Sequence, residues 1–231
     1  MTLGTSIGAV TGPDDLTALR ADVAAAALRL ADVGLVGAAG NVSARAGDLV
    51  AVTGTGVVLA RCRPEDVTVV DLDGHVVAGD RGPTSELDLH LGIYHDHGPD
   101  KVTGVVHTHA PYSTAVACVL DVLPVIHYQQ LLLGGEIRVA PYATFGTEAL
   151  ADHVRAALTD RTAALMANHG SVAIGRTLDV AVEGAYLLEW LATLHHRASA
   201  LGTPRQLTDD EQAAVVMAAI VRNYGPLGDP A

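Results

Sequence analysis

The chain has 231 residues, 49% of them hydrophobic and 17% charged, which is too apolar for a disordered chain and long enough for a large aliphatic core. Fourteen basic and 26 acidic residues give a formal net charge of −12, so a broad nucleic-acid-binding face is not expected. The two cysteines, Cys62 and Cys118, are too far apart to suggest a disulfide framework or a structural zinc site, so we expect reduced thiols in a cytoplasmic protein.

The first predicted elements are a long helix and a set of strands. Apolar residues recur at helical spacing over residues 14–33. Short β-branched runs predict strands at residues 49–53 and 67–72. An Asp-Gly turn then predicts a hairpin between the second of these strands and residues 75–78.

Helices and strands alternate in the rest of the chain. A serine N-cap predicts a helix over residues 85–97. No linker or repeat interrupts the pattern, so we expect one α/β domain over residues 1–231, with its core at about 14–224 and helices covering a mixed sheet. The further predicted strands are 102–107, 137–140, 163–167 and 171–174, and the further helices are 112–120, 146–158, 178–201 and 208–224.

Some chemistries and locations are not expected. Lys101 is the only lysine and lies in a predicted turn, whereas Schiff-base catalysis needs an activated, usually desolvated lysine. The N-terminal residues show no secretory signal pattern. The longest uncharged stretch contains two histidines and a proline, which does not predict a membrane span.

Two histidines, His107 and His109, lie at the end of the predicted strand at 102–107. Residues two apart on a strand point the same way, so both imidazoles can converge on one point. A catalytic zinc site has three protein ligands and an open position, and imidazole suits such a metal. Surface histidines at a strand end are the alternative, so the metal hypothesis needs a third ligand.

His169 is the best candidate for the third ligand, in the Asn168-His169-Gly170 link between two apolar strands. Spacing alone favours an ordinary turn histidine there. Glu86 is a candidate fourth ligand or base in the first turn of a helix, where the alternative is an acid that complements the helix dipole. Other histidines, at 75, 95, 97, 153, 195 and 196, are expected to be solvated or to cap helix ends.

Short turns rich in glycine and hydroxyl groups are candidates for an anion site, because they can present backbone N–H groups. Each is weak alone, since such residues build turns anyway. Beside a metal site, together they would form a phosphate pocket. They are Gly40-Asn41-Val42-Ser43, Thr53-Gly54-Thr55-Gly56 and Thr84-Ser85.

Taken in order, the motifs of the chain resemble those of the class II aldolase/adducin family, most closely its bacterial L-fuculose-phosphate aldolase branch. The resemblance covers residues from about 14 to about 224. Its motifs are Ala39-Gly40-Asn41-Val42-Ser43, Thr53-Gly54-Thr55-Gly56, Pro83-Thr84-Ser85-Glu86, Val105-Val106-His107-Thr108-His109-Ala110, Pro124-Val125-Ile126-His127-Tyr128, Ala140-Pro141-Tyr142-Ala143-Thr144-Phe145-Gly146 and Asn168-His169-Gly170.

The resemblance implies a single three-layer α/β/α domain with a mixed, largely antiparallel central sheet. It also implies a homotetramer with active sites at subunit boundaries. One Zn²⁺ per chain, with Mn²⁺ or Co²⁺ as alternatives, would be held by His107, His109 and His169. Glu86 would be the acid/base and would also bind the metal when substrate is absent.

The resemblance also assigns roles to tyrosines and to the turns. Tyr128 looks like a proton donor contributed by a neighbouring subunit, and Tyr224 resembles a C-terminal tyrosine that closes over the substrate. The positions that match the family's phosphate-binding residues are Asn41, Thr55, Gly56, Thr84 and Ser85.

The implied reaction is the zinc-dependent cleavage of a 2-ketose 1-phosphate, such as L-fuculose 1-phosphate, to dihydroxyacetone phosphate and a short aldehyde. The metal replaces a Schiff base, which accords with an exposed sole lysine. Alternatives in the family are a pentulose-phosphate 4-epimerase and a sugar-acid phosphate decarboxylase. An adducin-type structural module is also an alternative, against which the presence of Glu86 and three candidate histidine ligands argues.

Overall fold

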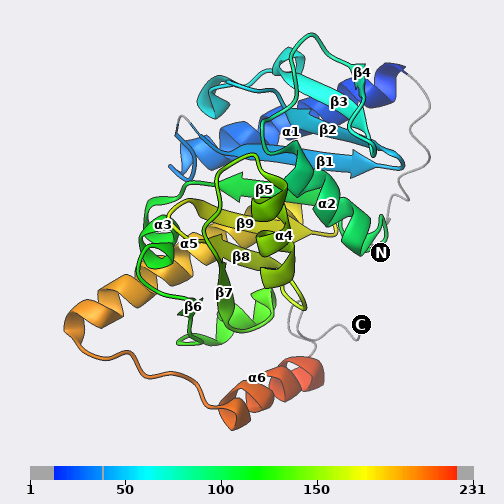
Figure 1. Ribbon diagram of the computed structural model, residues 1–231. Helices are drawn as coiled ribbons and strands as arrows, with labels where there is room; N and C mark the ends of the chain where they lie inside the picture. The colour runs from blue at the N-terminus through cyan, green and yellow to red at the C-terminus, as the bar shows by residue number, and fades with distance from the viewer. Residues whose placement is uncertain (1–12, 38, 223–231) are drawn as a thin grey trace.

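A computed structural model describes residues 13–37 and 39–222. The strands of this part of the chain form one nine-stranded sheet in the order β4-β3-β2-β1-β5-β9-β8-β7-β6 (Figure 1). Only β7 and β8 pair in parallel, so the predicted mixed, largely antiparallel sheet is confirmed. The strands are β1 Asn41–Ala46, β2 Leu49–Thr53, β3 Val67–Asp71, β4 Val76–Ala78, β5 Gly104–Thr108, β6 Val122–Leu123, β7 Ile137–Ala140, β8 Ala163–Met166 and β9 Gly170–Gly175.

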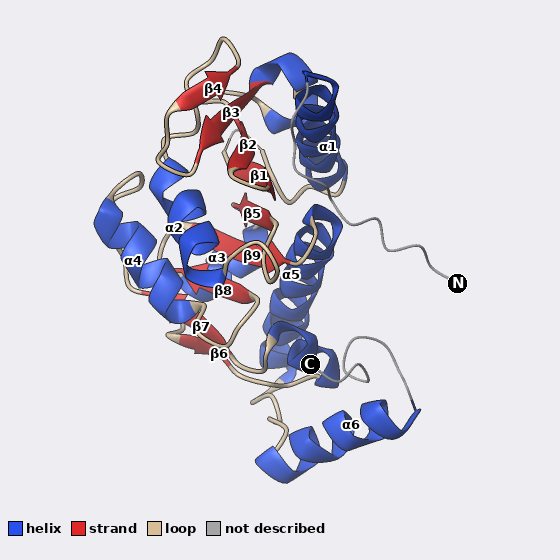
Figure 2. Ribbon diagram, turned by 90° about the vertical axis from the view of Figure 1, so that its right-hand side faces the viewer, coloured by secondary structure: helices blue, strands red, loops and turns tan. Residues whose placement is uncertain are grey.

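Helices cover both faces of the sheet, which gives the predicted three layers. α1 and α5 lie on one face and α2 and α4 on the other, as Figure 2 shows with the sheet edge-on. α3 packs beside α5, and α6 lies apart from the layers. None of the helices placed by the structure is long and apolar enough to cross a membrane. Their bounds are α1 Pro13–Asp32, α2 Leu87–His97, α3 Pro111–Ala117, α4 Glu148–Ala157, α5 Leu178–Leu201 and α6 Asp209–Arg222.

Side chains along the central strands point alternately to the two faces of the sheet, so the apolar core is divided between these faces. In β5, Val106 joins the apolar cluster under α1 and α5, while Val105 joins the cluster under α2 and α4. Because strand side chains alternate, His107 points to the same face as Val105. The sheet therefore directs His107 toward the helix that follows Glu86.

Two strands were not predicted: β6, which has only two residues, and β1. Residues 41–46 form β1, whereas the composition of Gly40-Asn41-Val42-Ser43 predicts a turn; Gly40 precedes the strand with a φ of +114°. All six residues of β1 are buried, and Asn41 pairs directly with His107 of β5. The turn interpretation failed because the polar side chains of β1 face a buried polar network instead of solvent.

The start of α2 also differs from the prediction. The helix begins at Leu87 with Glu86 at the N-cap position, not with Ser85 as the cap. Thr84 Oγ1 accepts a hydrogen bond from the Glu86 backbone N–H at 3.3 Å. The Glu86 side chain therefore lies just outside the first turn and reaches His107 on the central strand β5.

Candidate active site

Three separate segments bring the candidate metal ligands together. His107 lies in β5, His109 follows that strand, and His169 lies in the turn between β8 and β9. Their ligand nitrogens all lie within 4.8 Å of one another. The predicted convergence of the three histidines is therefore present in the structure.

The β8–β9 turn can carry His169 to this point because of its two neighbours. Asn168 has φ of +55°, a left-handed conformation that asparagine tolerates better than most residues. At Gly170, a Cβ atom would lie 2.2 Å from the Thr108 carbonyl oxygen. Only glycine fits so close to β5, and this approach brings the His169 turn against the histidines of that strand.

The polar atoms of the site face one another at short range. The Nε2 atoms of His107 and His109 are 3.0 Å apart. Glu86 Oε2 lies 3.2 Å from His107 Nε2, and Glu86 Oε1 lies 3.5 Å from His169 Nε2. The three rings are mutually edge-on, with centroids 4.8 to 4.9 Å apart.

His107 is held in the form that a metal needs. Its Nδ1–H donates to the Ser171 carbonyl oxygen at 3.0 Å, which leaves the lone pair of Nε2 directed at the centre of the cluster. Burial lowers the pKa of His107 to about 4, although the nearby charge of Glu86 opposes the shift. The pKa of His109 is also lowered, mainly by burial. Both rings are therefore neutral at pH 7 and can act as ligands.

Glu86 supplies negative charge at the same point. Burial alone would raise the pKa of Glu86, but its interaction with His107 and the hydrogen bond from Asn41 outweigh burial and hold the pKa below its usual value. Its Oε1 atom is buried and has no hydrogen-bond partner. A divalent cation bound by three neutral imidazoles would satisfy this oxygen and the converging lone pairs, so the residues fit a metal.

The cluster lies at a pocket of about 440 Å³. The turns predicted to bind phosphate meet at this pocket, because Gly54 bridges to Pro83 and the Thr55 N–H donates to the Gly82 carbonyl oxygen at 2.9 Å. All predicted phosphate-binding residues line it: Asn41, Thr55, Gly56, Thr84 and Ser85.

The structure adds residues that sequence reasoning did not place in the site. Tyr142 and Phe145 line the pocket and are 64% and 66% exposed, so their rings stand at its solvent side. His90, on α2, is fully buried and contacts Asn41 behind the pocket. A signal for His90 was present, because it follows Glu86 by four residues and therefore shares its helix face.

Tyr128, the predicted proton donor, does not line the pocket of the described chain. Tyr128 starts the 3₁₀ helix Tyr128–Leu133, is 40% exposed and packs its ring 4.6 Å from that of His127. Tyr224 lies outside the described residues.

Lys101 is exposed in the turn after α2, as expected.

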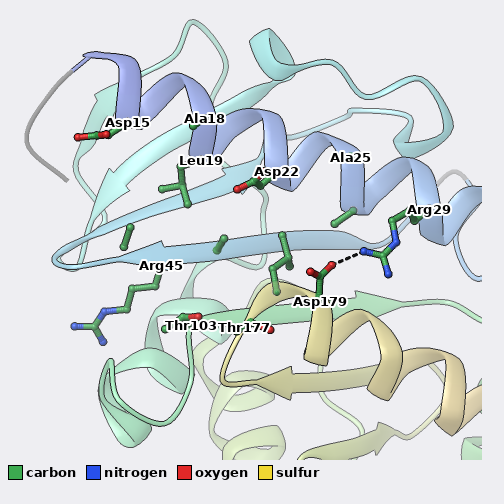
Figure 3. A pocket seen from close by; sticks show the side chains of 14 residues that line it. Asp15, Ala18, Leu19, Asp22, Ala25, Arg29, Arg45, Thr103, Thr177 and Asp179 are labelled. Carbon is green, nitrogen blue, oxygen red and sulfur yellow. Dashed lines mark hydrogen bonds and ion pairs between the residues drawn. The ribbon is translucent and has the colours of Figure 1, made fainter. Parts of the chain in front are cut away.

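A second cavity, of about 500 Å³, lies between α1, the edge of β1 and the start of α5 (Figure 3). Arg29 and Asp179 both line it and form an ion pair at 2.5 Å. Asp22 also lines it, and its pKa is raised by partial burial and by the charge of Asp179. None of the predicted site residues that the structure describes lines this cavity.

Comparison with known proteins agrees with this geometry. The family model described as "Class II Aldolase and Adducin N-terminal domain" matches residues 21–196. The chain is 41% identical, over 88% of its length and 92% of the relative, to the "5-methylthioribulose-1-phosphate/5-deoxyribulose-1-phosphate aldolase" of Rhodospirillum rubrum. It is 37% identical, over 82% of its length and 86% of the relative, to the "L-fuculose phosphate aldolase" of Escherichia coli K12.

Solved structures are also similar. An "L-fuculose 1-phosphate aldolase" superposes with a TM-score of 0.81 at 32% identity, over 90% of this chain and 97% of the other. YgbL of Klebsiella pneumoniae, described as a "putative aldolase/epimerase/decarboxylase", superposes with a TM-score of 0.78 at 27% identity, over 87% and 98% of the two chains.

Proposed function

Because the chain belongs to the class II aldolase and adducin family and is an aldolase of that class, we propose that it cleaves a 2-ketose 1-phosphate to dihydroxyacetone phosphate and a short aldehyde. The observation that carries this proposal is a cluster of three imidazoles and a buried carboxylate beside a pocket lined by phosphate-binding turns. The same proposal takes residues 1–231 as one domain, since one continuous sheet joins the apolar clusters.

The turns of the pocket supply the proposed phosphate site. Thr55 and Gly56 come from one turn and Thr84 and Ser85 from another, and hydroxyl and backbone N–H groups of this kind bind phosphate oxygens. No lysine or arginine lines the pocket in the described chain. The proposed site therefore binds phosphate through neutral donors.

The aldehyde end of the substrate would face apolar groups. Val57, Tyr142, Ala143 and Phe145 line the same pocket, and such side chains favour a methyl or thioether group over a hydroxyl. The named substrates of the relatives include 5-deoxyribulose 1-phosphate, 5-methylthioribulose 1-phosphate and L-fuculose phosphate. We propose a deoxy or methylthio ketose 1-phosphate as the substrate here.

Each residue of the cluster has its own proposed role in the reaction. A divalent ion, proposed to be zinc, would be held by His107, His109 and His169 and would polarise the substrate carbonyl as a Lewis acid. Glu86 would move the proton at the three-carbon fragment, because its Oε1 has no hydrogen-bond partner. Asn41 holds the other oxygen, Oε2, at 2.8 Å.

The proposed proton donor, Tyr128, would come from a neighbouring subunit of a homotetramer, and Tyr224 would close over the substrate. Support for a donor in trans is that Tyr128 is exposed and does not line the pocket of its own chain. Mixing inactive Tyr128→Phe chains with inactive His107→Ala chains should restore part of the activity through hybrid sites. Absence of recovery after verified subunit exchange would contradict the shared site.

A panel of ketose 1-phosphates tests the function directly. The metal-loaded protein should release dihydroxyacetone phosphate, which a coupled reductase assay detects, and a chelator should stop the release. Separate incubations test the alternatives: an epimerase would convert a pentulose phosphate to its 4-epimer, and a decarboxylase would release carbon dioxide from a phosphorylated sugar acid. Either product without dihydroxyacetone phosphate would replace the aldolase proposal.

A further inference from the structure

A line of hydrogen bonds runs through the buried core behind the candidate active site. The Tyr94 hydroxyl lies 2.7 Å from Ser43 Oγ, which lies 2.7 Å from His90 Nδ1. His90 Nε2 lies 2.5 Å from Asn41 Oδ1, and Asn41 Nδ2 lies 2.8 Å from Glu86 Oε2. All five side chains are buried, and those of Tyr94, Ser43 and His90 have no exposed surface. The line therefore connects the core to the carboxylate.

The carboxylate of Glu86 sets the direction of this line. An ionised carboxylate only accepts hydrogen bonds, so Asn41 must donate through Nδ2 and accept through Oδ1. His90 must then carry its proton on Nε2, and its bare Nδ1 accepts from the Ser43 hydroxyl. The Ser43 oxygen accepts in turn from Tyr94. Each donor along the line finds one acceptor.

His90 is suited to this position because it stays neutral. Burial lowers its pKa to about 3, against the opposing charge of Glu86. A neutral imidazole has one donor and one acceptor nitrogen. It can therefore link a hydroxyl to an amide oxygen while its ring fills the space between α2 and the sheet.

We propose that His90 is a positioning residue for the reaction: by holding the Asn41 amide in one orientation, it directs the Asn41 donor to Glu86 Oε2 and leaves Glu86 Oε1 to face the metal and the substrate. Without His90, the amide could rotate and present its oxygen to the carboxylate. The inference rests on the proposed role of Glu86 as the acid/base and adds a residue that does not itself line the pocket.

A double-mutant cycle separates this role from a merely structural one. His90→Leu should lower kcat about 10-fold or more with KM within about threefold, and His90→Gln, which keeps an amide donor, should recover part of the loss. In the Asn41→Ala background, His90→Leu should change kcat less than about twofold, because the residue through which it acts is gone. Additive losses would overturn the inference.

Tyr94→Phe is the matched control. It removes a hydrogen bond from the same buried line, at the far end, and leaves the link from His90 through Asn41 to Glu86 intact. Thermal unfolding should show a loss of stability for both Tyr94→Phe and His90→Leu, whereas kcat should fall less than about threefold for Tyr94→Phe. Equal losses of kcat at equal losses of stability would indicate a structural role alone.

A readout independent of activity uses the metal-free wild-type protein. The ¹⁵N spectrum of histidine-labelled protein, with His90→Gln to assign the resonances, should show the His90 ring neutral and protonated on Nε2. Protonation on Nδ1 would reverse the whole line and overturn the inference. If the wild-type protein released no dihydroxyacetone phosphate, the proposed function would fail and this inference with it, whereas an active wild type with an additive cycle would remove the inference alone.

Discussion

The two cavities are similar in size but differ in what their polar groups do. The cavity beside α1 is lined by Arg29 and Asp179, which pair with one another at the surface. Arg29 also binds Glu183, and the side chains of Asp179 and Glu183 are 79% and 66% exposed. At the other cavity, His107 and Glu86 are buried, and Glu86 Oε1 has no hydrogen-bond partner. Buried groups that converge without satisfying each other indicate a ligand, whereas exposed and paired groups do not.

The largest effect should come from removing one imidazole. His169→Ala leaves two ring ligands, so we expect metal content to fall from about one per chain to a small fraction. Turnover should fall by about 10³ or more, because the Lewis acid supplies several kcal/mol of stabilisation. Elemental analysis and the aldolase assay measure both. Full metal content with full turnover would show that His169 is not a ligand.

A smaller loss is expected for Glu86→Gln, which keeps the shape and removes the base. The variant should still bind the metal through its three histidines and should lose on the order of 10² in turnover. It should also fail to exchange the dihydroxyacetone phosphate proton with solvent deuterium. Normal exchange in a folded, metal-loaded variant would move the base to another residue, with Tyr128 the next to test.

Acid should destabilise the protein through the buried His90 behind the candidate active site. The pKa of His90 is lowered to about 3, below the value of about 6.5 for an unfolded histidine. The contribution of neutral His90 to the free energy of unfolding is therefore complete above pH about 6.5. It is lost as pH falls toward 3, because in that range the unfolded chain binds more protons than the folded chain. One such group changes the free energy of unfolding by up to about 1.4 kcal/mol per pH unit.

Denaturant titration of metal-free protein at pH 7 and pH 5 measures this loss. His90→Gln should reduce the difference in unfolding free energy between the two pH values. His95→Gln replaces an exposed histidine on the same helix and is the matched control. An unchanged pH difference in His90→Gln, relative to this control, would contradict a neutral buried His90.

The smallest effects are expected at the cavity beside α1. Arg29→Met breaks two exposed ion pairs, which are each worth less than about 1 kcal/mol. Turnover should stay within about twofold of wild type, and the midpoint of denaturation should move only slightly. A tenfold loss of activity would give this second cavity a role in the reaction and remove the contrast between the two.

The parts of the site that could be predicted are those with a local pattern. The strand before His107 is a β-branched run, and two-residue spacing on that strand places His107 and His109 together. His169 needed the family resemblance, because its position depends on the pairing of β9 with β5. The local pattern of apolar and polar residues does not indicate which turns lie next to one another once the strands have paired.

The failure to predict β1 has another cause. β1 has the alternation of a strand, with Val42 and Ala44 on one face, but its other face carries Asn41 and Ser43, which a sequence pattern assigns to a turn. These side chains are buried only because His90 satisfies them. A polar residue can be recognised as part of the core only when its partner is known, and here the partner lies more than 40 residues away.

The pairing of β5 with β9 also bears on the order of events when the chain folds. His107 and Ser171, whose contact orients the first ligand, are 64 positions apart in sequence, so a long loop must close before the three imidazoles can meet. A metal ion is a poor template for such a loop, because only His107 and His109 of the three candidate ligands lie near one another in the unfolded chain. Bound metal should therefore slow the unfolding of this protein far more than it speeds its folding.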